Sequence, residues 1–152
     1  MAGFKEAAPD VYNALAGMGR EAVKAGFSKE LIELVKIRAS QINGCAYCLH
    51  FHLNLARAVP VDAAKLDLLS VWREVALYSP RERAALALTE ALTDLAYKHP
   101  SDSVYDEARV HFDGNELIQL VAMIGTINMW NRIGVIFNCA PALPAKTETM
   151  RT

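Results

Sequence analysis

The chain has 152 residues, 53% of them in the set AVILMFWYC, and its 16 basic and 17 acidic residues give a formal net charge of −1. With glycine counted in place of tyrosine, the apolar share is about 55%, above the roughly 45–50% of ordinary globular domains. The balanced charge excludes the basic surface that nucleic-acid binding requires, and the apolar surplus predicts a single domain that buries surface against a partner or another copy of itself.

The sequence predicts neither membrane insertion nor export. The longest apolar stretch, 117–130, is interrupted by Gln119, Thr126 and Asn128 and is shorter than the roughly 20 apolar residues of a membrane span. The first ten residues, MAGFKEAAPD, include acidic residues and lack the apolar core of a signal peptide. Three cysteines are too few for a disulfide framework. We therefore expect a cytoplasmic protein without a membrane partner, in which a close cysteine pair is catalytic or metal-binding.

Apolar residues recur at spacings of three and four through most of the chain, and alanine is the commonest residue, so the pattern predicts successive helices and no strand. The first helix runs from Asp10, a favourable N-cap, to Lys24, and Gly26 ends it. A second helix follows Ser28 and continues to the break at Asn43-Gly44.

A third predicted helix starts at Cys45 and stops before Pro60, because proline cannot continue the hydrogen-bond ladder and disfavours a helical residue before it. Asp62 then caps a shorter helix. The segment 72–79 allows no assignment.

The clearest helix start in the chain is the segment 79–82, Ser-Pro-Arg-Glu. Ser79 can act as the cap, Pro80 suits the first helical position, and Glu82 completes a capping box. This helix is expected to reach about Tyr97, and a short helix over 102–111 follows.

The last predicted helix is a long apolar one. Asp113 and Glu116 repeat the capping-box pattern, with aspartate as the cap, and open a helix that reaches about Phe137. The tail, 141–152, is polar and contains two prolines, so we expect it to extend over a neighbour or to be disordered.

An internal similarity links two of the predicted helices. The stretch 30–35 is ELIELV and the stretch 116–121 is ELIQLV, with five identities in six at an offset of 86 residues. Each stretch follows a phenylalanine and a cap residue, and each leads to Ile-Asn. We predict a duplicated helical hairpin with copies at 28–58 and 113–138, and a chance match of two amphipathic helices is the alternative.

In this alignment two cysteines, a histidine and a glutamate of the first copy each have a neutral counterpart in the second. The pairs are Cys45 and Asn131, Cys48 and Gly134, His52 and Asn138, and Glu33 and Gln119. The duplication therefore predicts that the first copy carries the chemistry and that the second copy is structural.

The first copy holds a cysteine pair together with an acid and a base. Cys45 and Cys48 form a CxxC at a helix start, where the pair can cycle between dithiol and disulfide and the helix N–H groups favour a thiolate. His52 follows Cys48 by one turn and leans towards it as a base. Glu33 interrupts an apolar run, where a carboxylate is costly unless it is paired, and it reaches His52 if the two helices pack antiparallel. These residue types match the arrangement of an activated nucleophile.

Other interpretations of these residues stay open. With His52 or His50 as a third ligand, the cysteines fit a zinc site, and they also fit two buried packing residues. His50 lies on a different helix face from Cys48, so we expect it to be a bystander or to support the site residues indirectly. Cys139 has no partner in the sequence. The helix dipole favours Cys45 as the low-pKa sulfur, whereas the base favours Cys48, so these arguments leave the nucleophile undecided.

The spacing of Glu33, Cys45, Cys48 and His52, which is Glu-x11-Cys-x2-Cys-x3-His, resembles that of the AhpD-like alkylhydroperoxidases of the carboxymuconolactone decarboxylase superfamily. The segments ELVKIRASQINGCAYC, WREVALYSPRERAALALTEALT and INMWNRIGV are similar to that family as well, and the resemblance covers most of the chain. Tyr47 stands where AhpD-type peroxidases often carry a histidine.

This resemblance implies an all-α, AhpD-like helical bundle with a duplicated helical hairpin, in one domain over 1–152 that assembles into trimers or hexamers. It implies Cys48 as the peroxidatic thiolate, Cys45 as the resolving thiol, His52 as the base and Glu33 in the proton relay, with no cofactor and no metal. The substrate is then an organic hydroperoxide or hydrogen peroxide, and an external dithiol or lipoyl-type reductant resets the enzyme.

The sequence therefore predicts a thiol-dependent peroxidase with an antioxidant role. Two alternatives remain. One is a general thiol-disulfide oxidoreductase that acts on a protein or lipoyl disulfide, and the other is a non-catalytic oligomeric scaffold in which the cysteines bind metal.

Overall fold

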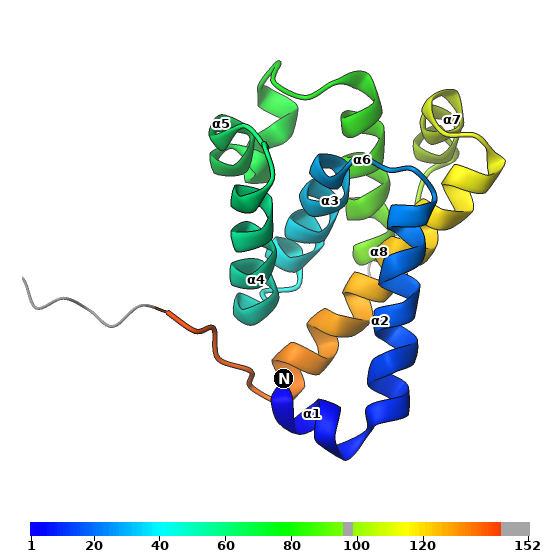
Figure 1. Cartoon of the computed structure of the whole chain (residues 1–152). Coiled ribbons are helices and arrows are strands. Elements are labelled where there is room, and N and C mark those ends of the chain that lie inside the picture. Colours follow the sequence, from blue (N-terminus) through cyan, green and yellow to red (C-terminus); the bar gives the residue numbers. More distant parts are fainter. Residues whose placement is uncertain (96–98, 144–152) are drawn as a thin grey trace, which may run out of the picture.

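The computed structural model describes residues 1–95 and 99–143, and within these ranges it contains helices and no strand (Figure 1). In chain order the helices are α1 (Ala2–Ala7), α2 (Pro9–Lys24), α3 (Lys29–Ile42), α4 (Ala46–Ala58), α5 (Ala63–Asp67), the 3-10 helix η1 (Leu69–Glu74), α6 (Pro80–Thr93), α7 (Asp102–His111) and α8 (Gly114–Ile136). The predicted all-α fold is confirmed. Over the described residues, every helix is too short or too polar to cross a membrane.

Several helices begin at the capping side chains that the sequence predicted. The Ser28 Oγ accepts a hydrogen bond from the backbone N–H of Leu31 at 3.2 Å and starts α3. Ser79 and Asp113 each form a complete capping box with the glutamate three residues later, at the starts of α6 and α8. Because each box satisfies two backbone N–H groups that the helix itself leaves unpaired, local sequence determines where these helices start.

The structure differs from the predicted helices in three places. α6 ends at Thr93, and Asp94 already leaves the regular helical conformation, because a short polar side chain competes for backbone hydrogen bonds. The predicted continuation to Tyr97 therefore fails, and its last residues fall in 96–98, outside the described range. The segment 2–7 forms α1, which was not predicted, and η1 covers the beginning of the unassigned segment. The predicted tail is described only over 141–143, which contain no helix.

The second predicted hairpin is a single helix. The first copy divides at Gly44, whose φ of +65° is a left-handed conformation that glycine adopts easily. At the same offset in the second copy stands Trp130, whose side chain disfavours that conformation, and α8 continues through it without a break. The similarity between the two stretches therefore does not extend to a second hairpin, and the duplication itself stays a prediction.

Helix α3 lies at the centre of the bundle, between α4 and α6 and against α8 (Figure 1). Its side chains enter two hydrophobic clusters: Leu31, Ile32 and Val35 pack with α6 and α8, whereas Leu34 and Ile37 pack with α4, η1 and α6. Helix α2 packs along α8. The elements that carry the predicted site are therefore fixed by burial on several sides.

Candidate active site

Helices α3 and α4 bring the four predicted site residues together. Glu33 lies on α3, Cys48 and His52 lie on α4, and Cys45 is the N-cap of α4. The short turn after α3 folds α4 back against it (Figure 1). Cys45 and Cys48 expose only 2% and 4% of their surface, and Glu33 and His52 are also buried. The site is thus a dry one, in which charges and protons need specific partners.

Glu33 holds the imidazole of His52, as the sequence predicted. The Oε2 atom of Glu33 lies 2.7 Å from Nδ1 of His52. An ionised carboxylate can only accept a hydrogen bond, so Nδ1 carries a proton and donates it to Glu33. In the neutral ring Nε2 then has no proton and is available as a base. The carboxylate thereby selects both the orientation and the tautomer of the histidine.

The two thiols form a close pair in the reduced state. Their Sγ atoms lie 2.6 Å apart, and the backbone N–H of Cys48 points at Cys45 Sγ over 3.3 Å. A small side-chain rotation brings two sulfurs at this separation to the roughly 2.05 Å of a disulfide bond. Cys48 lines a pocket, whereas Cys45 lies behind it and does not. The sequence left the choice between the two sulfurs undecided. The difference in access to the pocket favours Cys48 as the sulfur that meets a substrate.

The pKa of the Cys48 thiol is raised to about 12, with burial as the largest cause. The neighbouring sulfur of Cys45 adds to this rise, and a hydrogen bond with Asn131 partly offsets it. The loss of hydration therefore outweighs the field of the helix N-terminus, which favours a thiolate. The Cys48 thiol is therefore protonated at neutral pH, and it would need a nearby base to react as a nucleophile.

A buried polar network from α8 supports the site. Asn131 accepts a hydrogen bond from the amide of Asn43 at 2.9 Å and donates one to Ser40 Oγ at 3.0 Å. The Asn43 amide also donates to Asn128 at 2.8 Å. These contacts join the turn before Cys45 to α8 and hold the first turn of α4 in place. The sequence pairs Asn131 with Cys45 in the repeat and does not predict this supporting role.

Gly134 on α8 packs directly against both thiols. A Cβ atom at this position would lie 2.7 Å from Cys45 Sγ and 3.3 Å from Cys48 Sγ. Only glycine leaves room for the sulfur pair at this helix crossing. Sequence reasoning missed this role, although the repeat alignment had placed Gly134 opposite Cys48.

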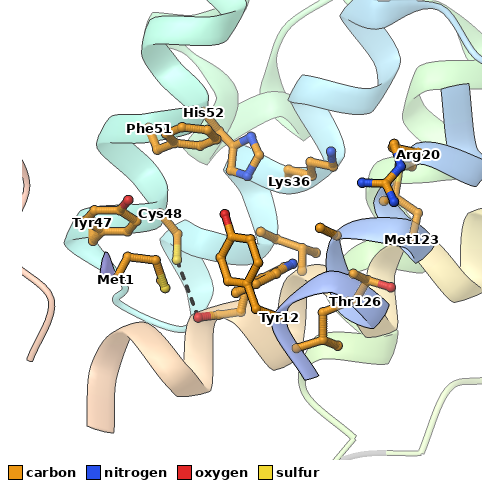
Figure 2. A pocket seen from close by; sticks show the side chains of 15 residues that line it. Met1, Tyr12, Arg20, Lys36, Tyr47, Cys48, Phe51, His52, Met123 and Thr126 are labelled. Atoms are coloured by element: carbon orange, nitrogen blue, oxygen red, sulfur yellow. Dashed lines mark hydrogen bonds between the residues drawn. The ribbon is translucent and has the colours of Figure 1, made fainter. Parts of the chain in front are cut away.

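A pocket of about 290 Å³ opens beside Cys48 and His52. Figure 2 shows the Cys48 sulfur and the His52 ring turned towards this space, with Tyr12 facing them from α2. Its walls are mainly apolar and aromatic, and the aromatic residues that line it are Tyr12, Tyr47, Phe51 and Trp130. Tyr47 and Phe51 stack with their rings 6° from parallel, and Tyr12 meets Trp130 edge to face at 5.3 Å. The pocket therefore suits a small organic molecule with an apolar body.

Two other candidate residues do not line the pocket. His50 shares a hydrogen bond of 3.1 Å with the Asn54 side chain. Cys139 is half-buried beyond the end of α8, and its sulfur adds to the rise in the pKa of Cys48. Over residues 1–95 and 99–143, histidine, cysteine and carboxylate side chains form no group of three suited to a metal ion.

Comparison with known proteins places this arrangement in a family. The profile of the carboxymuconolactone decarboxylase family matches residues 9–91. The protein YdfG of Bacillus subtilis (strain 168) is 36% identical over 132 residues, which cover 87% of this chain and 90% of YdfG.

Two solved structures share the fold. ATU0492 from Agrobacterium tumefaciens, assigned provisionally as the antioxidant defence protein AhpD, superposes with a TM-score of 0.87 at 33% identity, covering 93% of this chain and 97% of that one. A peroxidase-related protein from Ralstonia eutropha JMP134, with an alkylhydroperoxidase AhpD core, has a TM-score of 0.74 at 20% identity, covering 88% and 71%. The chain belongs to the carboxymuconolactone decarboxylase family, as an AhpD-like member.

Proposed function

We propose that the protein is a thiol-dependent peroxidase, which reduces organic hydroperoxides or hydrogen peroxide through a Cys45–Cys48 dithiol and disulfide cycle. One observation carries this proposal. Cys48 faces an apolar pocket, with the Cys45 sulfur 2.6 Å behind it and the Glu33–His52 pair one helical turn away. Nucleophile, resolving thiol and oriented base thus lie in one buried site of a family that includes enzymes.

In the first step His52 Nε2 accepts the proton of the Cys48 thiol, and Glu33 stabilises the imidazolium that forms. The thiolate attacks the outer oxygen of the hydroperoxide, and the O–O bond breaks. The alkoxide takes the proton from His52 and leaves as an alcohol. Cys48 is oxidised by two electrons to a sulfenic acid, and the peroxide is reduced by the same two.

In the second step the Cys45 thiol attacks the sulfenic sulfur of Cys48. The S–S bond forms, and the sulfenic hydroxyl leaves with the Cys45 proton as water. An external dithiol, which we propose to be lipoyl-like, then reduces the disulfide by two successive exchanges and leaves as its own cyclic disulfide. This requirement for an external reductant fits the reducing cytoplasm that the sequence predicts.

The high pKa of Cys48 gives the base a specific task. Because the thiol stays protonated at neutral pH, spontaneous attack by the resting enzyme is slow, and His52 must remove the proton when a peroxide occupies the pocket. We expect His52→Ala to slow Cys48 oxidation by about a hundredfold or more. Glu33→Gln should slow it as well, because the amide no longer stabilises the imidazolium.

Stopped-flow mixing of the reduced protein with hydroperoxides, with disulfide formation followed by mass, tests the proposal. Cys48→Ser should abolish peroxide consumption. Cys45→Ser should consume one equivalent of peroxide and stop at the Cys48 sulfenic acid, which a sulfenate-selective reagent captures. His50→Ala on the same helix, and Gln119→Glu at the position that the repeat pairs with Glu33, should stay close to wild type. Full turnover by Cys48→Ser would refute the peroxidase.

The same dithiol supports the general thiol-disulfide oxidoreductase that the sequence left as an alternative. A protein disulfide reaches Cys48 with difficulty, because the sulfur is buried at a small pocket, whereas a lipoyl ring on a flexible arm is small enough. Peroxide oxidation no faster than that of a free thiol, combined with rapid exchange with lipoamide, would assign this function instead. Stoichiometric zinc in the purified protein would favour the metal-binding scaffold.

A further inference from the structure

The pocket beside Cys48 carries two cationic side chains that the peroxidase cycle does not use. Lys36 on α3 is half-buried, Arg20 on α2 is exposed, and both line the pocket. Figure 2 shows their charged ends on the same side of the pocket, beyond the His52 ring as seen from Cys48. A pocket for a plain hydrocarbon peroxide has no need of either cation.

Neither cation is neutralised by an ion pair within the described part of the chain. The ion pairs formed there involve other lysines and arginines, among them Lys24, Arg38 and Lys65. Burial lowers the pKa of Lys36, and the charge of Glu33, one turn earlier on α3, raises it. The Glu33 carboxylate is itself committed to His52 at 2.7 Å.

The charges of the pocket therefore do not balance. Its lining residues include Lys36 and Arg20 and no aspartate or glutamate. Proton transfer from Cys48 to His52 creates one negative and one positive charge, so it leaves this excess unchanged. A partly desolvated ammonium and a guanidinium on one side of an apolar pocket are the groups that bind a carboxylate.

We propose that the pocket binds a small apolar molecule that carries a carboxylate, with Lys36 and Arg20 holding the carboxylate and the aromatic walls holding the apolar body. This inference rests on the proposed function for the identity of the molecule, which is a carboxylated organic hydroperoxide or a carboxylated dithiol reductant. The anion then determines which end of the molecule reaches Cys48, because the cations lie on the side of His52 away from Tyr47 (Figure 2).

Binding of unreactive probes tests the anion site without any turnover. Calorimetry with 4-isopropylbenzoate and with 4-isopropylbenzamide compares the same apolar body with and without the charge. We expect the acid to bind about tenfold more tightly, with an advantage that shrinks as salt is added. Lys36→Met and Arg20→Met should each reduce that advantage, and Lys36→Arg should restore part of it. The matched control is Lys29→Met, on the same helix and outside the pocket, which should keep it.

Equal binding of acid and amide, or an unchanged preference in both methionine variants, would overturn the inference. Arg20 is exposed, so Arg20→Met remains informative even if Lys36→Met unfolds.

A second experiment compares cumene hydroperoxide with its 4-carboxy derivative, and dihydrolipoamide with dihydrolipoate. A preference for the acid among the peroxides assigns the carboxylate to the oxidant, and one among the dithiols assigns it to the reductant. If the benzoate is preferred but no peroxide is reduced, the anion site stands and the peroxidase function fails.

Discussion

Cys48 combines a position at a helix start with almost complete burial, and these two features act on its proton in opposite directions. The N-terminal N–H groups of α4 favour a negative sulfur, while loss of hydration penalises it more strongly and raises its pKa to about 12. The protonated thiol is thereby protected from stray oxidants. In the proposed cycle, activation depends on the oriented imidazole of His52 rather than on a permanently ionised sulfur.

This raised pKa makes a prediction for stability. The folded protein holds the thiol proton more tightly than the unfolded chain, whose cysteine pKa is about 9. The resulting stabilisation is complete below about pH 9 and is lost as the pH rises towards about 12. We expect Cys48 to contribute roughly 2–4 kcal/mol to the decrease in free energy of unfolding over this range. This contribution is measured by denaturant unfolding of the reduced wild type and of Cys48→Ser at several pH values. Parallel pH profiles of the two proteins would contradict a raised pKa of Cys48.

At the scale of elements, helix α8 completes the active site, although the four proposed catalytic residues come from the α3–α4 hairpin. Its Asn131 bonds to the turn that precedes Cys45, and its Gly134 lies against the two sulfurs. The close approach of α8 to the start of α4 therefore depends on a position without a side chain. The second predicted copy, 113–138, therefore forms a wall of the candidate site through hydrogen bonding and packing.

Gly134→Ala tests this close approach. The added methyl group would lie 2.7 Å from Cys45 Sγ, so the sulfurs or α8 must move. We expect a loss of about 1–3 kcal/mol in stability and slower closure of the Cys45–Cys48 disulfide, with more sulfenic acid captured by a trapping reagent. Gly114→Ala is the matched control, because that glycine lies at the start of the same helix with open space around it. Equal disulfide rates in the two variants would show that α8 does not position the thiols.

At the scale of the whole molecule, part of the apolar surplus of the composition lies on the surface of α8. An apolar stripe along α8, consisting of Ile118, Val121, Met129 and Ile136, recurs at helical spacing and is exposed, with 69% of Ile118 and 77% of Ile136 accessible. Such a stripe is typical of a surface that meets another protein. The homo-oligomer that composition and resemblance predict stays a prediction, and we expect this stripe to lie in its interface.

Light scattering of the purified protein should therefore give the mass of a trimer or hexamer. Val121→Glu and Met129→Glu place charges within the stripe and should yield smaller species whose circular dichroism is unchanged, because both side chains are exposed within one chain. A monomeric wild type at micromolar concentration would contradict this prediction. If both glutamate variants keep the wild-type mass, the interface lies elsewhere and the prediction is contradicted as well.

The sequence by itself determined most of the helices and the four residues that we propose carry the chemistry. Capping residues act within a single turn, so Ser28, Ser79 and Asp113 marked helix starts correctly. Spacing of four on one helix placed Cys48 and His52 on a common face, and the carboxylate of Glu33 in an apolar run required a partner. These inferences depend on neighbours in sequence, and so they needed no tertiary structure.

The tertiary structure decided what depends on packing between distant segments. Access to the pocket distinguished Cys48 from Cys45, and burial raised the Cys48 pKa against the helix dipole. The roles of Asn131 and Gly134, and the convergence of Arg20 with Lys36, arise where α2, α3, α4 and α8 meet. Such contacts join residues far apart in the chain, and whether a group is desolvated depends on what covers it. The local sequence pattern therefore predicts neither the long-range contacts nor the desolvation of a group.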